Sequence, residues 1–195
     1  MKANKTTYTI ILIVDTFLSI KAAKELKGAA MELTGNKEFI IVNRHGHFDH
    51  FLGNCIFPKQ STVISSEIAR QSVLEQKKEY KFGKEIYKDE IVSLEKQLDT
   101  VKDKAEMLDI KNTLTIYRNF SNKECEVVPP NMTFDDKLYI YGTLENVRLR
   151  VVGKTHSPGD VICIDENRKV AFVGDLLFVD EHPYLGPGDP WQSKK

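Results

Sequence analysis

Short apolar runs and one amphipathic stretch alternate along the first part of the chain. Residues 8–14 and 39–42 are continuous apolar runs of strand length. Between them, apolar residues recur at helical spacing after Ser19, at Ile20, Ala23, Leu26, Ala30 and Leu33. This order predicts a strand, a helix and a second strand, an arrangement in which the two strands lie parallel in one sheet. Residues 43–50 follow the second strand, where such sheets usually place their chemistry.

The middle of the chain is predicted to be helical. After a short strand at residues 62–64, residues 67–111 are rich in Glu, Lys and Leu and contain no proline. A narrow apolar stripe in this segment alternates steps of three and four, at Ile91, Leu94, Leu98, Val101, Ala105 and Leu108. Such a stripe packs against one partner helix, and we expect that helix within the same chain. A dimer contact and a lid over a functional site are the alternatives.

The chain after Pro129 and Pro130 changes to a strand-rich pattern. Candidate strands cover residues 138–141, 147–152, 161–165 and 169–173, with turns at Asn146 and at Asn167-Arg168. Two polar loops, residues 155–160 and 174–175, interrupt this region. Together the patterns predict an α/β protein, a single domain over residues 1–195 with a helical insertion at about residues 67–111.

Composition narrows the class of protein. With 28 Lys and Arg against 28 Asp and Glu the net charge is zero, which gives no clear signal for nucleic acid and none for an anionic membrane. No apolar run approaches the roughly 20 residues of a membrane span, and Asp15 interrupts the run at residues 8–14 that otherwise resembles a signal peptide. Cys55, Cys125 and Cys163 form no CxxC pair, which favours reduced thiols over disulfides. A cytoplasmic protein is therefore expected.

Metal-ligating side chains are concentrated in residues 45–50, whose sequence is HGHFDH. Zinc binds neutral imidazole nitrogens and carboxylate oxygens. In a loop, the alternate residues His45 and His47 can point toward one ion, while Asp49 and His50 reach a second. The pattern therefore predicts a metal site, and a solvated polar loop after a strand is the alternative.

The motif order resembles that of the metallo-β-lactamase superfamily. HGHFDH matches the family's H-x-H-x-D-H motif, THSPGD at residues 155–160 resembles its second metal-bearing loop, and FVGD at residues 172–175 resembles the loop that supplies a bridging carboxylate. Asp15 is similar to an aspartate that supports the metal ligands in the family, although Phe17 stands where the usual glycine would be. The resemblance implies an αββα sandwich.

The resemblance also implies roles for individual residues. His45, His47 and His156 would hold a first zinc ion, and Asp49, His50 and the bridging Asp175 a second, although other divalent metals stay open. Asp49 would orient a metal-bound hydroxide as general base, attacking an ester, thioester, lactone, lactam or phosphodiester of a small-molecule substrate. The diiron members of the family carry Glu at the position of His47, so the histidine favours zinc and hydrolysis.

Two further residues, His182 and Tyr184, follow the bridging carboxylate and are candidates for substrate contact.

The chain also departs from the family pattern. Family members end with a further histidine ligand, whereas no histidine follows Trp191 here, and the sandwich is expected to be incomplete at both ends. The second metal is therefore expected to bind more weakly than the first. Exposed sheet edges, or the helical insertion, would allow homo-oligomers to form. A non-catalytic or regulatory metal-binding homologue, or a fragment, is the alternative to an enzyme.

Overall fold

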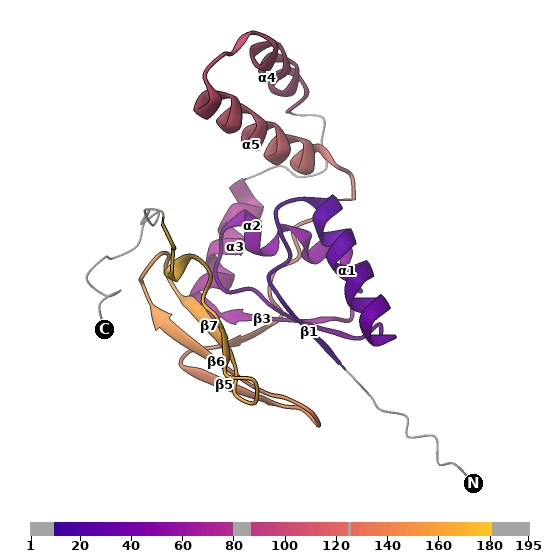
Figure 1. Ribbon diagram of the computed structural model, residues 1–195, viewed down its shortest axis with the longest axis vertical. Helices are drawn as coiled ribbons and strands as arrows, with labels where there is room; N and C mark the ends of the chain where they lie inside the picture. The colour runs from indigo at the N-terminus through magenta and orange to yellow at the C-terminus, as the bar shows by residue number, and fades with distance from the viewer. Residues whose placement is uncertain (1–9, 80–86, 125, 181–195) are drawn as a thin grey trace.

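The computed structural model describes residues 10–79, 87–124 and 126–180. Two four-stranded sheets pack face to face, and helices cover the outer face of the first sheet (Figure 1). In this described part of the chain the layers are helix, sheet and sheet. The fold is an α/β sandwich, as the sequence predicted.

The first sheet is parallel and holds the short apolar runs. Its strands, in spatial order, are β1 (Ile11–Val14), β2 (Phe39–Val42), β3 (Thr62–Ser66) and β4 (Met132–Phe134). Ile13 pairs with Ile41 and Ile41 with Val63, and all three side chains are buried on the face that the helices cover, whereas Val42 and Ile64 are buried on the opposite face. The three-residue strand β4 was not predicted.

Helices α1 (Ile20–Thr34) and α3 (Glu67–Glu79) lie on the outer face of this sheet (Figure 1). Ser19 caps the first turn of α1, and Gly35 ends the helix with a φ of 69°, a left-handed conformation that glycine adopts without strain. Between β2 and β3 the chain forms two short helices that the sequence did not predict, α2 (Phe48–Phe51) and η1 (Leu52–Ile56).

The second sheet is an antiparallel meander. It consists of β5 (Lys137–Tyr141), β6 (Asn146–Gly153), β7 (Asp160–Asp165) and β8 (Val170–Phe172), followed by a short 3-10 helix, η3 (Gly174–Leu176). Its inner face packs on the first sheet, with Leu149 and Val161 against Val42 and Ile64. This contact brings the ends of β2, β7 and β8 into one region.

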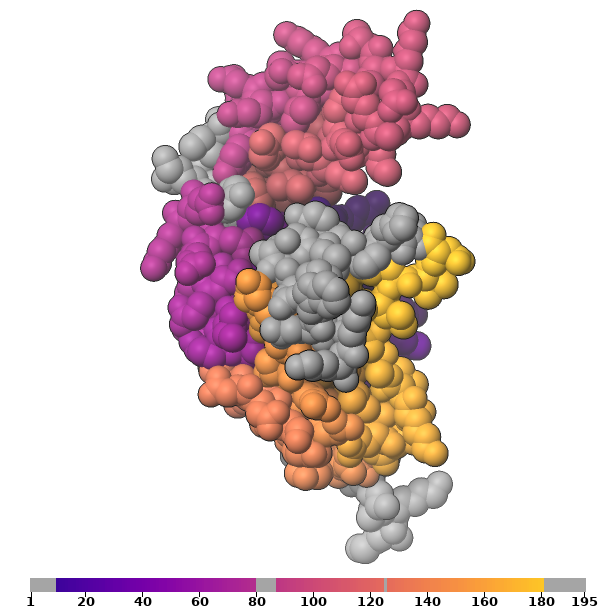
Figure 2. Space-filling model, turned by 90° about the vertical axis from the view of Figure 1, so that its left-hand side faces the viewer, coloured from indigo at the N-terminus to yellow at the C-terminus, as the bar shows by residue number. Residues whose placement is uncertain are grey.

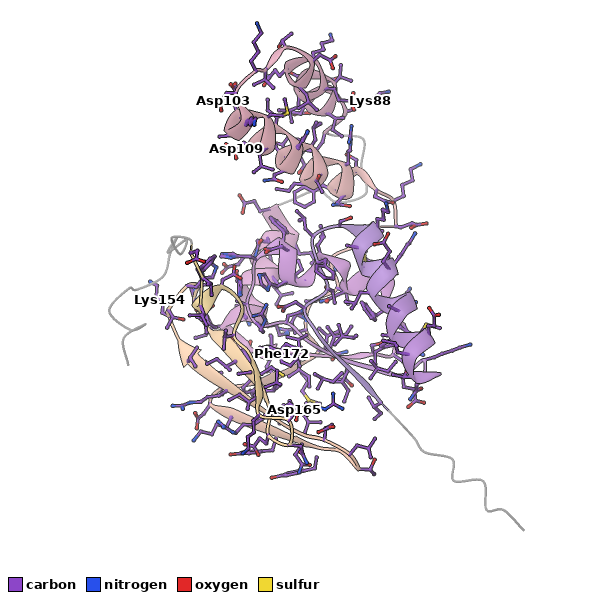
Figure 3. All side chains as sticks on the ribbon, in the orientation of Figure 1. Lys88, Asp103, Asp109, Lys154, Asp165 and Phe172 are labelled. Atoms are coloured by element: carbon purple, nitrogen blue, oxygen red, sulfur yellow. The ribbon has the colours of Figure 1, made fainter. Side chains whose placement is uncertain are left out.

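The predicted helical insertion is a hairpin of α4 (Lys88–Thr100) and α5 (Lys104–Ser121) that projects from the body (Figures 1 and 2). Asp103 caps α5 at the outer end of the hairpin by accepting hydrogen bonds from the backbone of Ala105 and Glu106 (Figure 3). Helix α5 ends at Ser121, ten residues beyond the predicted end of the helical segment at 111. The first helix of the predicted segment, α3, lies on the first sheet and is not part of the hairpin.

The apolar stripe does not lie on one helix, because α4 ends at Thr100 and α5 begins at Lys104. In α4 the stripe residues Ile91, Leu94 and Leu98 are half-buried, and α4 lies beside α5, as the hydrogen-bonded ion pair of Arg118 with Glu95 shows. The expectation of a partner helix within the chain is confirmed for these residues. It is wrong for Ala105 and Leu108, which are both exposed on α5.

No helix in the described ranges is long and apolar enough to cross a membrane. The thiol of Cys163 is buried, and Cys125 lies outside the described residues.

Candidate metal centre

A buried amide network shapes the loop that carries the HGHFDH motif. The Asn43 side chain donates to the backbone oxygen of His50 over 2.8 Å, and Asn54 donates to Asn43 over 2.8 Å. Thr16 in turn donates to Asn54 over 2.9 Å. These side chains are nearly inaccessible to solvent, so their hydrogen bonds act in a low-dielectric environment and hold one loop conformation. The loop therefore presents its histidines from a rigid base.

Three imidazole nitrogens and one carboxylate converge at the end of β2. His45 Nε2 lies 3.0 Å from His47 Nδ1, and His156 Nε2 lies 3.1 Å from the same nitrogen. Asp175 Oδ2 lies 4.0 Å from His45 Nε2 and 3.4 Å from His156 Nε2. Ligands at about 2.0–2.1 Å around a tetrahedral zinc ion are separated by about 3.3 Å. The four donors, which lie within 4.8 Å of one another, thus have the spacing that one zinc ion requires. We call this set the first cluster.

A second cluster adjoins the first and shares Asp175. His50 Nε2 lies 3.1 Å from Asp49 Oδ2 and 3.6 Å from Asp175 Oδ2. Neither contact has hydrogen-bond geometry, so among the described residues this buried nitrogen has two carboxylates nearby but no hydrogen-bond partner. A buried polar atom without a partner is costly, and a cation between the imidazole and the two carboxylates would satisfy it. The donor set of the second cluster therefore also fits a metal ion.

Residues behind the ligands fix their orientation. His50 Nδ1 lies 2.8 Å from Asp15 Oδ2, and because an ionised carboxylate only accepts hydrogen bonds, Nδ1 carries the proton and Nε2 faces the cluster. Asp160 performs the corresponding task for the loop of His156. Its carboxylate accepts hydrogen bonds from the backbone of His156 and Ser157 and from the hydroxyls of Thr155 and Ser157.

Electrostatic surroundings separate the histidines into two groups. Burial, together with the neighbouring imidazoles of His50 and His47, lowers the pKa of His45 to about 3. Burial and His156 likewise lower the pKa of His47. Both imidazoles are therefore neutral near pH 7, the form in which their lone pairs are available to a metal.

The second cluster favours positive charge. Burial alone would disfavour a charged His50, but the carboxylates of Asp15, Asp175 and Asp49 outweigh it and raise its pKa to about 11. The pKa of Asp175 is in turn held well below its usual range by His50. Without metal, a proton on His50 supplies the positive charge that the surrounding carboxylates favour. A divalent cation can take its place.

The six predicted ligands come together from three separate segments of the chain. His45, His47, Asp49 and His50 come from the loop and α2, His156 precedes β7, and Asp175 lies in η3. The two proposed substrate residues, His182 and Tyr184, lie outside the described residues. Asp15 stands behind His50, as the resemblance implied.

Sequence reasoning missed three supporting residues. Asp160 was visible only as part of the THSPGD segment. Arg44, which contacts Asp15, and Gln76, whose amide donates to the backbone oxygen of Gly46, carried no sequence signal, because their partners lie on other elements.

Comparison with known proteins agrees with this geometry. Residues 9–195 match the family model described as the metallo-beta-lactamase superfamily, and the chain belongs to this superfamily. Most members of this class are metal-dependent hydrolases. A comparison with curated proteins gave no match.

Several solved structures share the fold. A metallo-beta-lactamase from Pontibacter korlensis has a TM-score of 0.56 and 15% identity, covering 91% of this chain and 62% of its own. The metallo-beta-lactamase IND-7 has a TM-score of 0.62 and 9% identity, with 96% and 65% covered. DIM-1 metallo-beta-lactamase has a TM-score of 0.58 and 13% identity, with 94% and 63% covered. At these identities the likeness concerns the fold, and the chain spans less than two thirds of each structure.

Proposed function

We propose that the protein is a zinc-dependent hydrolase of a small-molecule ester, thioester, lactone, lactam or phosphodiester. One observation carries the proposal: donors of the first cluster lie within 4.8 Å of one another, and a second cluster shares its carboxylate Asp175. Divalent cations bound in this way polarise a carbonyl or phosphoryl oxygen and lower the pKa of water, which is the chemistry that hydrolysis needs.

The protein's own residues set the direction of attack. The side chain of Asp49 is 58% exposed, whereas those of His45, His50 and His156 are almost fully buried. Among the described residues the clusters are therefore most open on the side of Asp49, and we expect substrate to approach from there. The pKa of Asp49 is lowered because its contact with His50 outweighs the effect of burial, so its carboxylate is ionised near pH 7. It can accept a hydrogen bond from an attacking water and so act as general base.

The substrate is the least determined part of the proposal, because one fold hosts many hydrolytic reactions. The solved structures named above are metallo-beta-lactamases, and DIM-1 has also been solved after exposure to ceftazidime. A β-lactam therefore belongs among the first substrates to be tested, beside an ester, a thioester, a lactone and a phosphodiester.

A second candidate function is non-catalytic or regulatory metal binding. It is favoured by the second cluster, which offers three donors among the described residues, one of them shared with the first cluster. A chain with one well-held metal and a poorly held second one could use metal to organise its loops without turnover.

The test combines metal analysis with a substrate panel. Protein supplied with zinc and then desalted is expected to contain at least one zinc per chain and to hydrolyse one member of the panel. The double substitution His45→Ala and His47→Ala should abolish both, while Asp99→Asn, at an exposed position on α4, should change neither. Stoichiometric zinc without turnover on any substrate would support the regulatory candidate. Retention of zinc by the double variant would refute the site itself.

A further inference from the structure

We propose that Arg44 is a positioning residue for the second cluster, acting through Asp15 on His50 and through Gly174 on Asp175. The inference rests on the proposed function, because it assumes that the second cluster binds a metal ion. The Arg44 side chain itself belongs to neither cluster.

The first step is the contact with Asp15. The backbone N–H of Arg44 donates to Asp15 Oδ1 over 2.9 Å, and its Nε donates to Asp15 Oδ2 over 2.5 Å. Nη2 of the same guanidinium also contacts Asp15 Oδ2. Both side chains are largely buried, so this charge-assisted contact is shielded from water. The guanidinium of Arg44 holds one oxygen of the Asp15 carboxylate and the backbone N–H holds the other, and together they fix its plane.

The second step leads from Asp15 to the cluster. The oxygen that Arg44 holds, Asp15 Oδ2, is also the one that lies 2.8 Å from His50 Nδ1. Asp15 itself has a φ of 59°, a strained conformation for a residue other than glycine. Such a strained conformation persists only where surrounding contacts stabilise it by more than the strain costs. Arg44 supplies the contacts on one side of this carboxylate and His50 the contact on the other.

The third step concerns the loop of Asp175. The guanidinium of Arg44 lies against Gly174, where an added Cβ would overlap Nη1 and Cζ. Gly174 has a φ of 55° and directly precedes Asp175, the carboxylate shared by the two clusters. The backbone oxygen of Arg44 also accepts a hydrogen bond from Val161 in β7 over 2.8 Å. Arg44 thus joins the end of β1, the start of β7 and the loop after β8.

The experiment is a stepwise zinc titration of metal-free protein in competition with a chromophoric chelator. Arg44→Lys keeps the charge but loses the planar fork. It is expected to raise the dissociation constant of the second zinc by about tenfold to a hundredfold, the usual effect of losing support behind a metal ligand, with a smaller change for the first zinc, which shares Asp175 but keeps three imidazoles. With cobalt, the absorption bands of the second equivalent should shift as the orientation of His50 changes.

Two further variants test the route of the effect. Asp15→Asn alone should weaken the second step, and adding Arg44→Lys to it should weaken that step by less than Arg44→Lys does alone, because only the route through Gly174 is left to lose. Gly174→Ala should also weaken the second step although it leaves residue 44 an arginine, because the added methyl group displaces the guanidinium. Gly35→Ala, at a similar positive φ of 69° but with open space around the added methyl group, is the matched control and should leave both steps unchanged.

The outcomes separate this inference from the proposed function. Equal weakening of both zinc steps in Arg44→Lys would mean general loosening of the fold, and an unchanged second step in Arg44→Lys and Gly174→Ala would mean no positioning role. Either result overturns the inference, as does a wild-type protein that binds zinc in a single step. The expected pattern in a protein that hydrolyses nothing would uphold the inference and overturn the proposed function.

Discussion

At the residue scale, two histidines of one six-residue motif have opposite acid–base behaviour. The pKa of His45, buried beside other imidazoles, is lowered to about 3, whereas carboxylates around His50 raise its pKa to about 11. The two side chains therefore bring different charges to the centre when no metal is bound. Burial and spatial neighbours cause the difference, some from the motif itself and others, Asp15 and Asp175, from distant segments.

This contrast predicts a stability maximum of the metal-free protein near pH 6.5. Below pH 6.5, the ordinary value, the unfolded chain protonates His45 while the folded protein does not, so stability falls as the pH drops toward 3. Above pH 6.5, folded His50 keeps a proton that the unfolded chain loses, so stability falls as the pH rises toward 11. The slope is at most about 1.4 kcal/mol per pH unit for each proton.

Urea unfolding of metal-free protein between pH 4 and about pH 10 measures this profile. His50→Asn should flatten the alkaline side and narrow the pH range of the acidic decline, because it also removes one cause of the lowered pKa of His45. Stability that rises steadily from neutral to alkaline pH would contradict the assigned surroundings of His50.

Asp49 is the residue whose loss should affect the reaction most directly. Asp49→Asn keeps the size of the side chain but removes the proton acceptor, so kcat is expected to fall by about 10²- to 10⁴-fold. The first cluster does not include Asp49, so the first zinc should remain bound. Steady-state kinetics and metal analysis of the same preparation check both parts, with Asp99→Asn as the control. An unchanged kcat would exclude Asp49 as general base.

At the scale of elements, the helical hairpin is fastened to the body by aromatic rings at its base. The ring of Phe120 in α5 lies 4.9 Å from that of Phe48, the residue between His47 and Asp49. Tyr87 stacks on Tyr117 at 5.0 Å, and Phe120 itself is buried. The outer part of the hairpin has no such anchor, because α4 contains no buried residue.

Substitutions at the two ends of the hairpin should therefore differ in effect. Phe120→Ala is expected to lower the free energy of unfolding of the whole protein by about 3–5 kcal/mol, because it leaves a cavity in the core. Leu98→Asp, at a half-buried position, should open α4 locally and leave the global unfolding midpoint nearly unchanged.

Chemical denaturation together with hydrogen exchange of residues 88–100 distinguishes the two effects. A large drop in global stability from Leu98→Asp would show that the outer hairpin folds as one unit with the body.

At the scale of the whole molecule, the two clusters differ in how completely they are built. The first offers three imidazoles and a carboxylate, whereas the second offers one imidazole and two carboxylates, one of them shared. Mild chelation is therefore expected to remove the second zinc while the first remains, and activity should rise with added zinc after the first site is full. Metal analysis after graded chelation, run beside the substrate assay, checks this order. Two equally tight sites per chain would contradict it.

The edge of the second sheet concerns the whole molecule as well. Val170 and Phe172 on the edge strand β8 are 45% and 44% exposed, and in the described residues β8 pairs with β7 alone. An exposed apolar edge can pair with another chain, so we expect association at high protein concentration. Val170→Lys should reduce it in sedimentation velocity experiments. A monomer at every concentration would contradict this expectation.

The sequence by itself determined the main elements and the donors of the site. Runs such as residues 39–42 are apolar throughout because parallel strands are buried on both faces, and the HGHFDH motif concentrates ligands within one loop. Apolar runs and ligand motifs are properties of short segments, so they can be recognised from the sequence alone. Beyond the motif, His156 and Asp175 could be named from resemblance, but no local pattern shows that they meet His45.

The tertiary structure alone decided the properties that depend on distant neighbours. Packing of the two sheets brings His156 and Asp175 to the loop after β2, and only then do pKa values diverge, because each carboxylate acts over a few ångströms. The turn between α4 and α5 could not be predicted from the sequence either, because the apolar stripe continues through Val101 although the chain turns there. Arg44 is the clearest example, because the residues around it in the sequence do not indicate its contacts with Asp15 and Gly174. Those contacts form only because the ends of β1 and β2 and the loop after β8 lie side by side in the folded protein.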